Sequence, residues 1–341
     1  MDTRRLIGSV LAYIGAIVVI VGAVVLAVAY TRNPISNRYH EHAFDQHNGL
    51  GNVALYERKY PEAISEFSAM SDVFPERGGP YMLRAMAKNR AGMRADAVQD
   101  FTKALELMSP AEIKPGSDIK TTRATLLYDR GNTYEAMGKH DLAITDFNEA
   151  LRLNPEIPDA RSLLAEAYLH AKHYRECVEA ATIVIDGNQP YSYRALMTRA
   201  EAEGNLKRPD QSANDLARVT YGYPNFALGW ANRGWYEYQA GELWPSVESS
   251  TRALDLNRTM AFAWFNLGLS YTALGDRTRA KQSYAGGLLR SARGTPTGAT
   301  GAPESRAAAI KDLRDALGTY PKSAALTKEA LGWVTAGTVP L

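Results

Sequence analysis

The stretch that decides the fold is Ala124–Pro155, which reads ATLLYDRGNTYEAMGKHDLAITDFNEALRLNP. A second stretch, Ala261–Arg290, reads AFAWFNLGLSYTALGDRTRAKQSYAGGLLR and keeps the same order of large and small residues. The shared positions are Leu127, Gly131, Tyr134, Gly138, Ala143 and Phe147 in the first stretch and Trp264, Gly268, Tyr271, Gly275, Ala280 and Tyr284 in the second. Two packed antiparallel helices need this pattern, because a small residue lets them approach and a large one fills the gap beside it.

The pattern recurs about every 34 residues, and it resembles the tetratricopeptide repeat. We place seven copies in an array over 44–294, at 44–77, 78–109, 124–157, 158–192, 193–226, 227–260 and 261–294, with a loop insert at 110–123. The resemblance implies an all-α fold, an α-solenoid of helix pairs. Pro61, Pro209 and Pro245 each fall at the start of a predicted second helix, where the missing amide proton costs little.

The tail departs from the repeat. Residues 295–303 are rich in Gly, Thr and Pro and predict a flexible loop. Residues 304–341 predict further helices, and a solenoid needs an atypical terminal element to cover its last apolar face. We therefore expect these helices to be a C-terminal cap.

The N-terminal region predicts a membrane anchor. After a short flank at 1–5, Leu6–Tyr30 (residues 6–30) carries no charged residue. As a helix it would be about 37 Å long, against a hydrocarbon core of about 30 Å. Residues 31–43 would be a juxtamembrane linker. The alternative is a cleaved leader, since Ala27-Val28-Ala29 resembles a cleavage site, but the apolar run exceeds the usual 7–15 residues.

The flanking charges bear on the orientation of this anchor. Arg4 and Arg5 precede the apolar run, and Arg32 and Arg38 follow it, so the arginines balance under the positive-inside rule. The α-amino group before the span and the acidic residues after it favour a cytoplasmic N-terminus. We expect a single-pass protein of the cell (plasma or inner) membrane, with its repeats outside the cytoplasm.

Composition excludes several function classes. The formal net charge is +2, with 39 basic and 37 acidic residues. This balance does not give the excess of positive charge that attracts the phosphates of nucleic acid. The single cysteine, Cys177, excludes a disulfide framework within the chain. The sequence has no G-x-S-x-G, no H-E-x-x-H and no lysine-bearing phosphate loop. His40 and His42 would point about 200° apart on a helix. We expect no catalytic residues, no cofactor and no metal.

The resemblance implies that the first helices of the repeats line a concave surface that binds protein or peptide partners. The residues at the lining positions are Trp235, Tyr238, Phe262, Phe265, Leu269, Leu228, Met82, Met86, Tyr128, Asn132 and Asn52. The C-terminal part of this surface is aromatic, and aromatic side chains are common interface anchors. The alternative for Trp235 and Phe265 is that they are core beneath the cap.

These observations predict a membrane-anchored, non-catalytic scaffold or adaptor. Two alternatives are an exported soluble binder whose leader is removed and an accessory subunit of an envelope-processing enzyme. Gly8, Ala12 and Ala16 are four residues apart, a spacing that allows close approach of membrane helices, so weak self-association is a further prediction.

Overall fold

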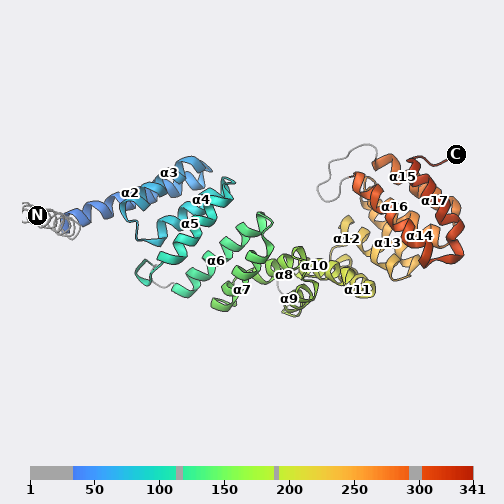
Figure 1. Cartoon of the computed structure of the whole chain (residues 1–341), viewed down its shortest axis with the longest axis horizontal. Helices are drawn as coiled ribbons and strands as arrows, with labels where there is room; N and C mark the ends of the chain where they lie inside the picture. Colours follow the sequence, from blue (N-terminus) through green and yellow to red (C-terminus); the bar gives the residue numbers. More distant parts are fainter. Residues whose placement is uncertain (1–33, 113–117, 188–191, 292–301, 341) are drawn as a thin grey trace, which may run out of the picture. The chain divides into compact units, whose positions relative to one another are not determined.

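The computed structural model describes residues 34–112, 118–187, 192–291 and 302–340. These residues hold α-helices, two short 3-10 helices and no strand (Figure 1). Contacts divide the chain into two compact units, Met1–Ile157 and Pro158–Leu341. The helices of the first unit are α2 (Pro34–Tyr56), α3 (Tyr60–Val73), α4 (Gly78–Arg90), α5 (Arg94–Leu107), η1 (Pro110–Glu112), α6 (Ile119–Ala136) and α7 (His140–Leu153).

The helices of the second unit are α8 (Ala160–His170), α9 (Tyr174–Asp186), α10 (Ser192–Asn205), α11 (Pro209–Gly222), α12 (Ala227–Gln239), α13 (Leu243–Leu256), α14 (Ala261–Ala273), α15 (Arg277–Ser291), α16 (Ala302–Thr319), η2 (Pro321–Ser323) and α17 (Ala324–Ala336). In both units each helix packs on its neighbour along the chain, and the helices pair as α2 with α3 through to α14 with α15. The last two helices cover the final pair, because α16 packs on α14 and α17 packs on α15. The predicted all-α helix-pair fold is therefore confirmed.

Close approach within a pair depends on a glycine opposite an aromatic ring. A Cβ atom added at Gly131 of α6 would lie 2.9 Å from Cε1 of Phe147 on α7. A Cβ atom added at Gly268 of α14 would lie 2.8 Å from Cε1 of Tyr284 on α15. Both rings are fully buried. The alternation of small and large residues in the sequence is thus the packing interface of the two helices.

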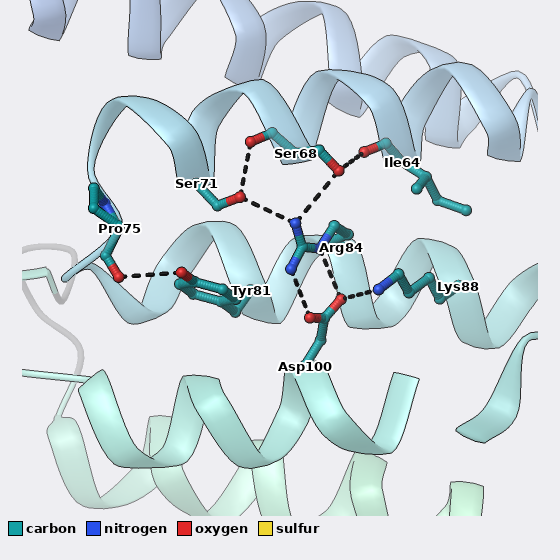
Figure 2. A network of polar contacts seen from close by, with 8 residues as sticks. All are labelled: Ile64, Ser68, Ser71, Pro75, Tyr81, Arg84, Lys88 and Asp100. Atoms are coloured by element: carbon teal, nitrogen blue, oxygen red, sulfur yellow. Dashed lines mark hydrogen bonds and ion pairs between the residues drawn. The ribbon is translucent and has the colours of Figure 1, made fainter. Parts of the chain in front are cut away.

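A buried arginine bridge joins three successive helices, and it occurs three times among the described residues. In Figure 2, Arg84 of α4 donates to Ser71 of α3 at 3.0 Å and, from Nε and Nη2, to both carboxylate oxygens of Asp100 of α5 at 2.8 and 2.7 Å. Lys88 adds an ion pair to the same carboxylate at 2.7 Å. Burial alone would raise the pKa of Asp100, but the hydrogen bonds from Arg84 and Lys88 hold it below its usual value.

The same geometry recurs at Arg130 with Asp146 and at Arg199 with Asp215, at distances of 2.7–2.8 Å. The third nitrogen of each arginine reaches a threonine on the preceding helix, at 2.9 and 2.8 Å. In the 227–260 repeat, Ser249 occupies the aspartate position. There Arg233 binds Glu237 of its own helix at 2.7 Å instead.

The turn between the two helices of each pair contains one residue with positive φ. These residues are Arg58, Gly92, Gly138, Lys172, Lys207, Gly241 and Gly275. Gly241 (φ 83°) has the residue type that this conformation favours, whereas Lys172 (φ 64°) carries a side chain in the same left-handed region. Three of the seven turns therefore hold a strained backbone.

Helix boundaries differ from the sequence-based expectation at three places. The helix α2 starts at Pro34, so most of the predicted linker 31–43 is helical; its extension is held by the ring of Phe44 against Phe74 and by an ion pair between Glu41 and Arg77. The helix α6 starts at Ile119, inside the predicted insert 110–123, because Ile119 packs on the core of this unit. The helix α16 starts at Ala302, inside the predicted loop 295–303.

The predicted membrane span 6–30 lies outside the described residues, as do the flank 1–5 and the residues Gly8, Ala12 and Ala16. Within the ranges that the structure describes, no helix has both the length and the apolar character needed to cross a bilayer. The anchor stays a prediction from the sequence.

Candidate functional site

Two adjacent pockets in the second unit form the candidate site. The first, which we call the groove pocket, has a volume of about 460 Å³ and lies between α10, α11, α12 and α14. Its lining is Met197, Thr198, Ala200, Glu201, Asn205, Leu216, Leu228, Asn232, Trp235, Tyr236 and Phe262. Pockets of this size with apolar walls and a few polar groups are typical ligand sites.

The second, which we call the cap pocket, has a volume of about 370 Å³ and is closed on one side by α16. Its lining is Gly204, Lys207, Pro209, Trp235, Tyr238, Gln239, Lys311, Asp312, Asp315, Ala316, Thr319 and Tyr320. Trp235 belongs to both pockets, so its half-buried side chain is a wall that they share.

A row of aromatic rings connects the pockets. Trp235 stacks on Tyr238 with ring centroids 6.0 Å apart and an interplanar angle of 26°, and it lies 6.4 Å from Phe262. Tyr238 lies 5.7 Å from Tyr320, whose hydroxyl donates a hydrogen bond to the Tyr238 carbonyl oxygen at 3.1 Å. That hydrogen bond joins the segment after α16 to α12 and fixes the wall of the cap pocket.

Glycine makes room for one ring of the groove pocket. A Cβ atom at Gly204 of α10 would lie 2.2 Å from Cε1 of Tyr236, so the ring of Tyr236 rests directly on the backbone of α10. Burial, with a smaller contribution from Glu201, raises the pKa of the Tyr236 hydroxyl, which is neutral at physiological pH. This pocket thus presents neutral hydrogen-bonding groups beside a single acidic residue, Glu201.

The cap pocket contains an unusual carboxyl group. Burial raises the pKa of Asp312 to about 6, against a reference value of 3.8; Lys311 lowers it and Asp315 raises it. Lys311 donates to Asp315 at 2.7 Å, in an exposed ion pair. Among the described residues no hydrogen-bond or ion-pair partner reaches the Asp312 carboxyl group, in contrast to Asp315.

The structure brings together three of the predicted binding residues as pocket walls: Trp235, Leu228 and Phe262. Two others are buried in the core and line neither pocket. Phe265 and Leu269 are 2% and 1% exposed, in a core cluster with Leu313 of α16 and Trp333 of α17. Tyr238 is 6% exposed and lines the cap pocket. The helices α16 and α17 need an apolar surface to pack on, and these side chains supply it.

The predicted binding residues of the first unit line neither of these two pockets. Met82, Met86 and Tyr128 are half-buried and pack on the core around Phe101, and Asn132 is half-buried. Asn52 is exposed and donates to the backbone and the side chain of Asn48 at 2.7 Å.

Sequence reasoning missed the polar lining of both pockets. Glu201 and Asn205 lie on α10, the first helix of the 193–226 repeat, and Asn232 lies on α12, the first helix of the 227–260 repeat. Extending the lining positions along these two helices could have found them. Asp312 and Tyr320 lie in the cap, outside the repeat, where the pattern offers no signal.

Cys177 is buried, and its thiol donates to the carbonyl oxygen of Thr198 at 3.9 Å. Burial raises its pKa to about 12, so the thiol is not a nucleophile at physiological pH. Cys177 lines neither pocket.

Comparison with known proteins agrees with this architecture. Two family models, both described as tetratricopeptide repeat, match residues 124–157 and 263–288. A tetratricopeptide repeat protein from Parabacteroides merdae has a solved structure that is 15% identical, with a TM-score of 0.54, over 84% of this chain and 99% of that chain. The C-terminal part of a repeat-containing protein from Cytophaga hutchinsonii is 13% identical, with a TM-score of 0.58, over 75% of this chain and 97% of that chain.

At these identities the solved structures show the fold alone. The matching family models describe a repeat and no catalytic family. The described residues of this chain therefore form an all-α fold, and two of its segments, 124–157 and 263–288, match the tetratricopeptide repeat.

Proposed function

We propose that this chain is a membrane-anchored, non-catalytic adaptor that binds an extended segment of a protein partner along the groove pocket and the cap pocket. The observation that carries this proposal is the half-buried Trp235, which forms a wall common to two pockets. A row of two pockets with a shared aromatic wall fits successive side chains of one extended segment. Aromatic residues in such positions commonly supply much of the binding energy of an interface.

The groove pocket favours an apolar side chain in that segment. Leu228, Trp235 and Phe262 supply its apolar walls, and Asn205 and Asn232 lie beside them as donors and acceptors for the backbone of the segment. The backbone N–H and C=O groups of an extended segment lose their hydrogen bonds to water when the segment binds. Amide side chains along the groove can replace those hydrogen bonds.

The test begins with the full chain in detergent, from which bound proteins are identified by mass. For each identified partner, binding is then measured for Trp235→Ala, Leu228→Ala and Trp244→Ala. We expect the first two to weaken binding at least about tenfold, on the scale of an interface hot spot. Trp244 is the matched control, since it is 57% exposed on α13 and lines neither pocket. Equal loss with Trp244→Ala, or no loss with Trp235→Ala, would contradict the proposal.

The anchor and its orientation are part of the proposal. The uncharged run 6–30 supports a membrane span, and the charges around it favour repeats outside the cytoplasm. The protein should stay with membranes after extraction by high salt or alkali, and a reporter fused after Leu341 should be active only if it works outside the cytoplasm. A mature N-terminus near Tyr30 would show instead a cleaved leader. Self-association through Gly8, Ala12 and Ala16 would be tested by crosslinking in membranes.

A further inference from the structure

We propose that the cap pocket binds the cationic side chain of an arginine or lysine in the partner segment, with the Asp312 carboxylate as its counter-ion and aromatic rings as its walls. This inference rests on the proposed function and specifies the chemistry of the ligand. It follows from the charges in the pocket, from the rings that surround them and from the position of the pocket beside the groove pocket.

The charges in the cap pocket leave one carboxylate without a counter-ion. Two lysines and two aspartates line the pocket. Lys311 and Asp315 neutralise each other at 2.7 Å. Lys207 is exposed, on the turn between α10 and α11, and it is not among the charges that shift the pKa of Asp312. Asp312 is half-buried, and no described residue pairs with it. A buried carboxylate is costly unless a cation accompanies it, so a cationic ligand removes this cost.

The walls of the cap pocket suit the same ligand. Trp235, Tyr238 and Tyr320 all line it, and the first two are stacked. Cations bind favourably near the faces of aromatic rings, and Trp and Tyr are the strongest of these. An arginine side chain also has an apolar stem, which can lie along Trp235 while its charged end reaches Asp312. A neutral or acidic side chain would leave the carboxylate unpaired.

The groups that face Asp312 come from several elements. Lys311 and Asp315 lie on its own helix α16, Tyr238 faces it from α12 and Tyr284 from α15, and Lys207 lines the same pocket from the turn after α10. The tyrosines stay neutral, since burial raises the pKa of both hydroxyls. The carboxylate itself titrates at a pKa of about 6 in the free protein, so cation binding should weaken as the pH falls through this value.

The experiment uses the full chain in detergent, with 5-fluorotryptophan in place of its five tryptophans. The fluorine signal of Trp235 is the one that Trp235→Phe removes. The probes are N-acetyl-arginine amide and N-acetyl-citrulline amide, which have nearly the same shape but differ in charge. We expect the arginine probe to shift the Trp235 signal at pH 8 with an affinity at least about tenfold above that of citrulline.

Variants separate the charge from the fold. Asp312→Asn should lower the affinity for the arginine probe at least about tenfold, and Asp312→Glu should restore part of it. The matched control is Asp255→Asn, an exposed carboxylate on α13 outside both pockets. Equal binding of arginine and citrulline would overturn the inference, as would unchanged binding in Asp312→Asn or tighter binding of N-acetyl-glutamate amide through Lys207. If the probes fail but Trp235→Ala and Leu228→Ala still lose an identified partner, the proposed function stands and this inference falls.

Discussion

Arg130 and Asp146 lie 16 residues apart and are joined by two hydrogen bonds of 2.8 Å, from Nε and Nη2 of the arginine to the two carboxylate oxygens. The same spacing of 16 joins Arg84 to Asp100 and Arg199 to Asp215. In each case the arginine also bonds to the helix before it, so the bridge connects one repeat to the next. The aspartates are 5–8% exposed at their side chains, and the pairs are therefore largely removed from water.

Removing one partner of such a buried pair should be costly. Asp146→Ala leaves Arg130 without its counter-ion, and we expect a loss of about 3–5 kcal/mol in the free energy of unfolding. The matched control is Glu149→Ala, which breaks the exposed pair with Arg152 and should change stability little. Chemical denaturation of both variants measures the difference. Similar losses would show that the bridge contributes no more than a surface ion pair.

The strained turn residues predict a stabilising change. Lys172 has φ 64°, and replacement by glycine should raise the stability by about 1 kcal/mol, because the left-handed region costs other residues about 1–2 kcal/mol. The reverse change at the equivalent position, Gly241→Lys, should destabilise by a similar amount. Melting temperatures of the two variants should move in opposite directions; movement in the same direction would mean that the turn conformation does not decide stability.

Close helix packing predicts intolerance of larger residues. Gly131→Ala places a methyl group 2.9 Å from the ring of Phe147, and Ala143→Phe inserts a ring at a fully buried position. Both should destabilise the protein, the second by about 1–3 kcal/mol or more. Gly318→Ala in α16 is the control, because no atom lies within 4 Å of the added carbon. Thermal unfolding of the three variants checks the helix register.

The aromatic residues near the pockets should divide into two classes. Phe265→Ala removes a side chain that is 2% exposed beneath α16 and α17, at an expected cost of about 3–5 kcal/mol. Phe262→Ala removes a half-buried pocket wall and should cost clearly less. Binding and melting temperature measured on the same samples separate the classes. A larger stability loss in Phe262→Ala than in Phe265→Ala would show that the division is wrong.

The Asp312 carboxyl group predicts a pH dependence of stability. Its pKa is about 6 in the folded chain and near 3.8 in the unfolded chain, so its ionisation opposes folding at high pH and the cost disappears as the pH falls. Asp312→Asn should therefore stabilise the protein at pH 8, by at most about 3 kcal/mol, since one pKa unit corresponds to about 1.4 kcal/mol. The advantage over the unmodified chain should shrink towards pH 4, as measured by urea unfolding at several pH values.

The helix pairs could be predicted from the sequence because their positions depend on local alternation of large and small residues. For example, the spacing of Gly131 and Phe147 in the sequence predicts that these two residues pack against each other. The roles of Phe265 and Leu269 could not be decided in this way. In the repeat pattern, these positions face either solvent or the element that follows the last repeat. Only the placement of α16 shows that Phe265 and Leu269 are covered. Asp312 was missed for the same reason, since it enters the pocket from a helix without a repeat pattern.

Trp235 is a wall that the two pockets share, so their occupation could be coupled through one side chain. Because one indole is a wall of both, any ligand that rotates or clamps this side chain changes the shape of the neighbouring pocket at the same time. Thermodynamic linkage then requires the effect to be reciprocal: occupation of the groove pocket alters the affinity of the cap pocket by the same factor as the converse. The binding free energy of two side chains of one partner would then differ from the sum of their separate binding free energies. A mutation in either pocket would change the selectivity of both pockets.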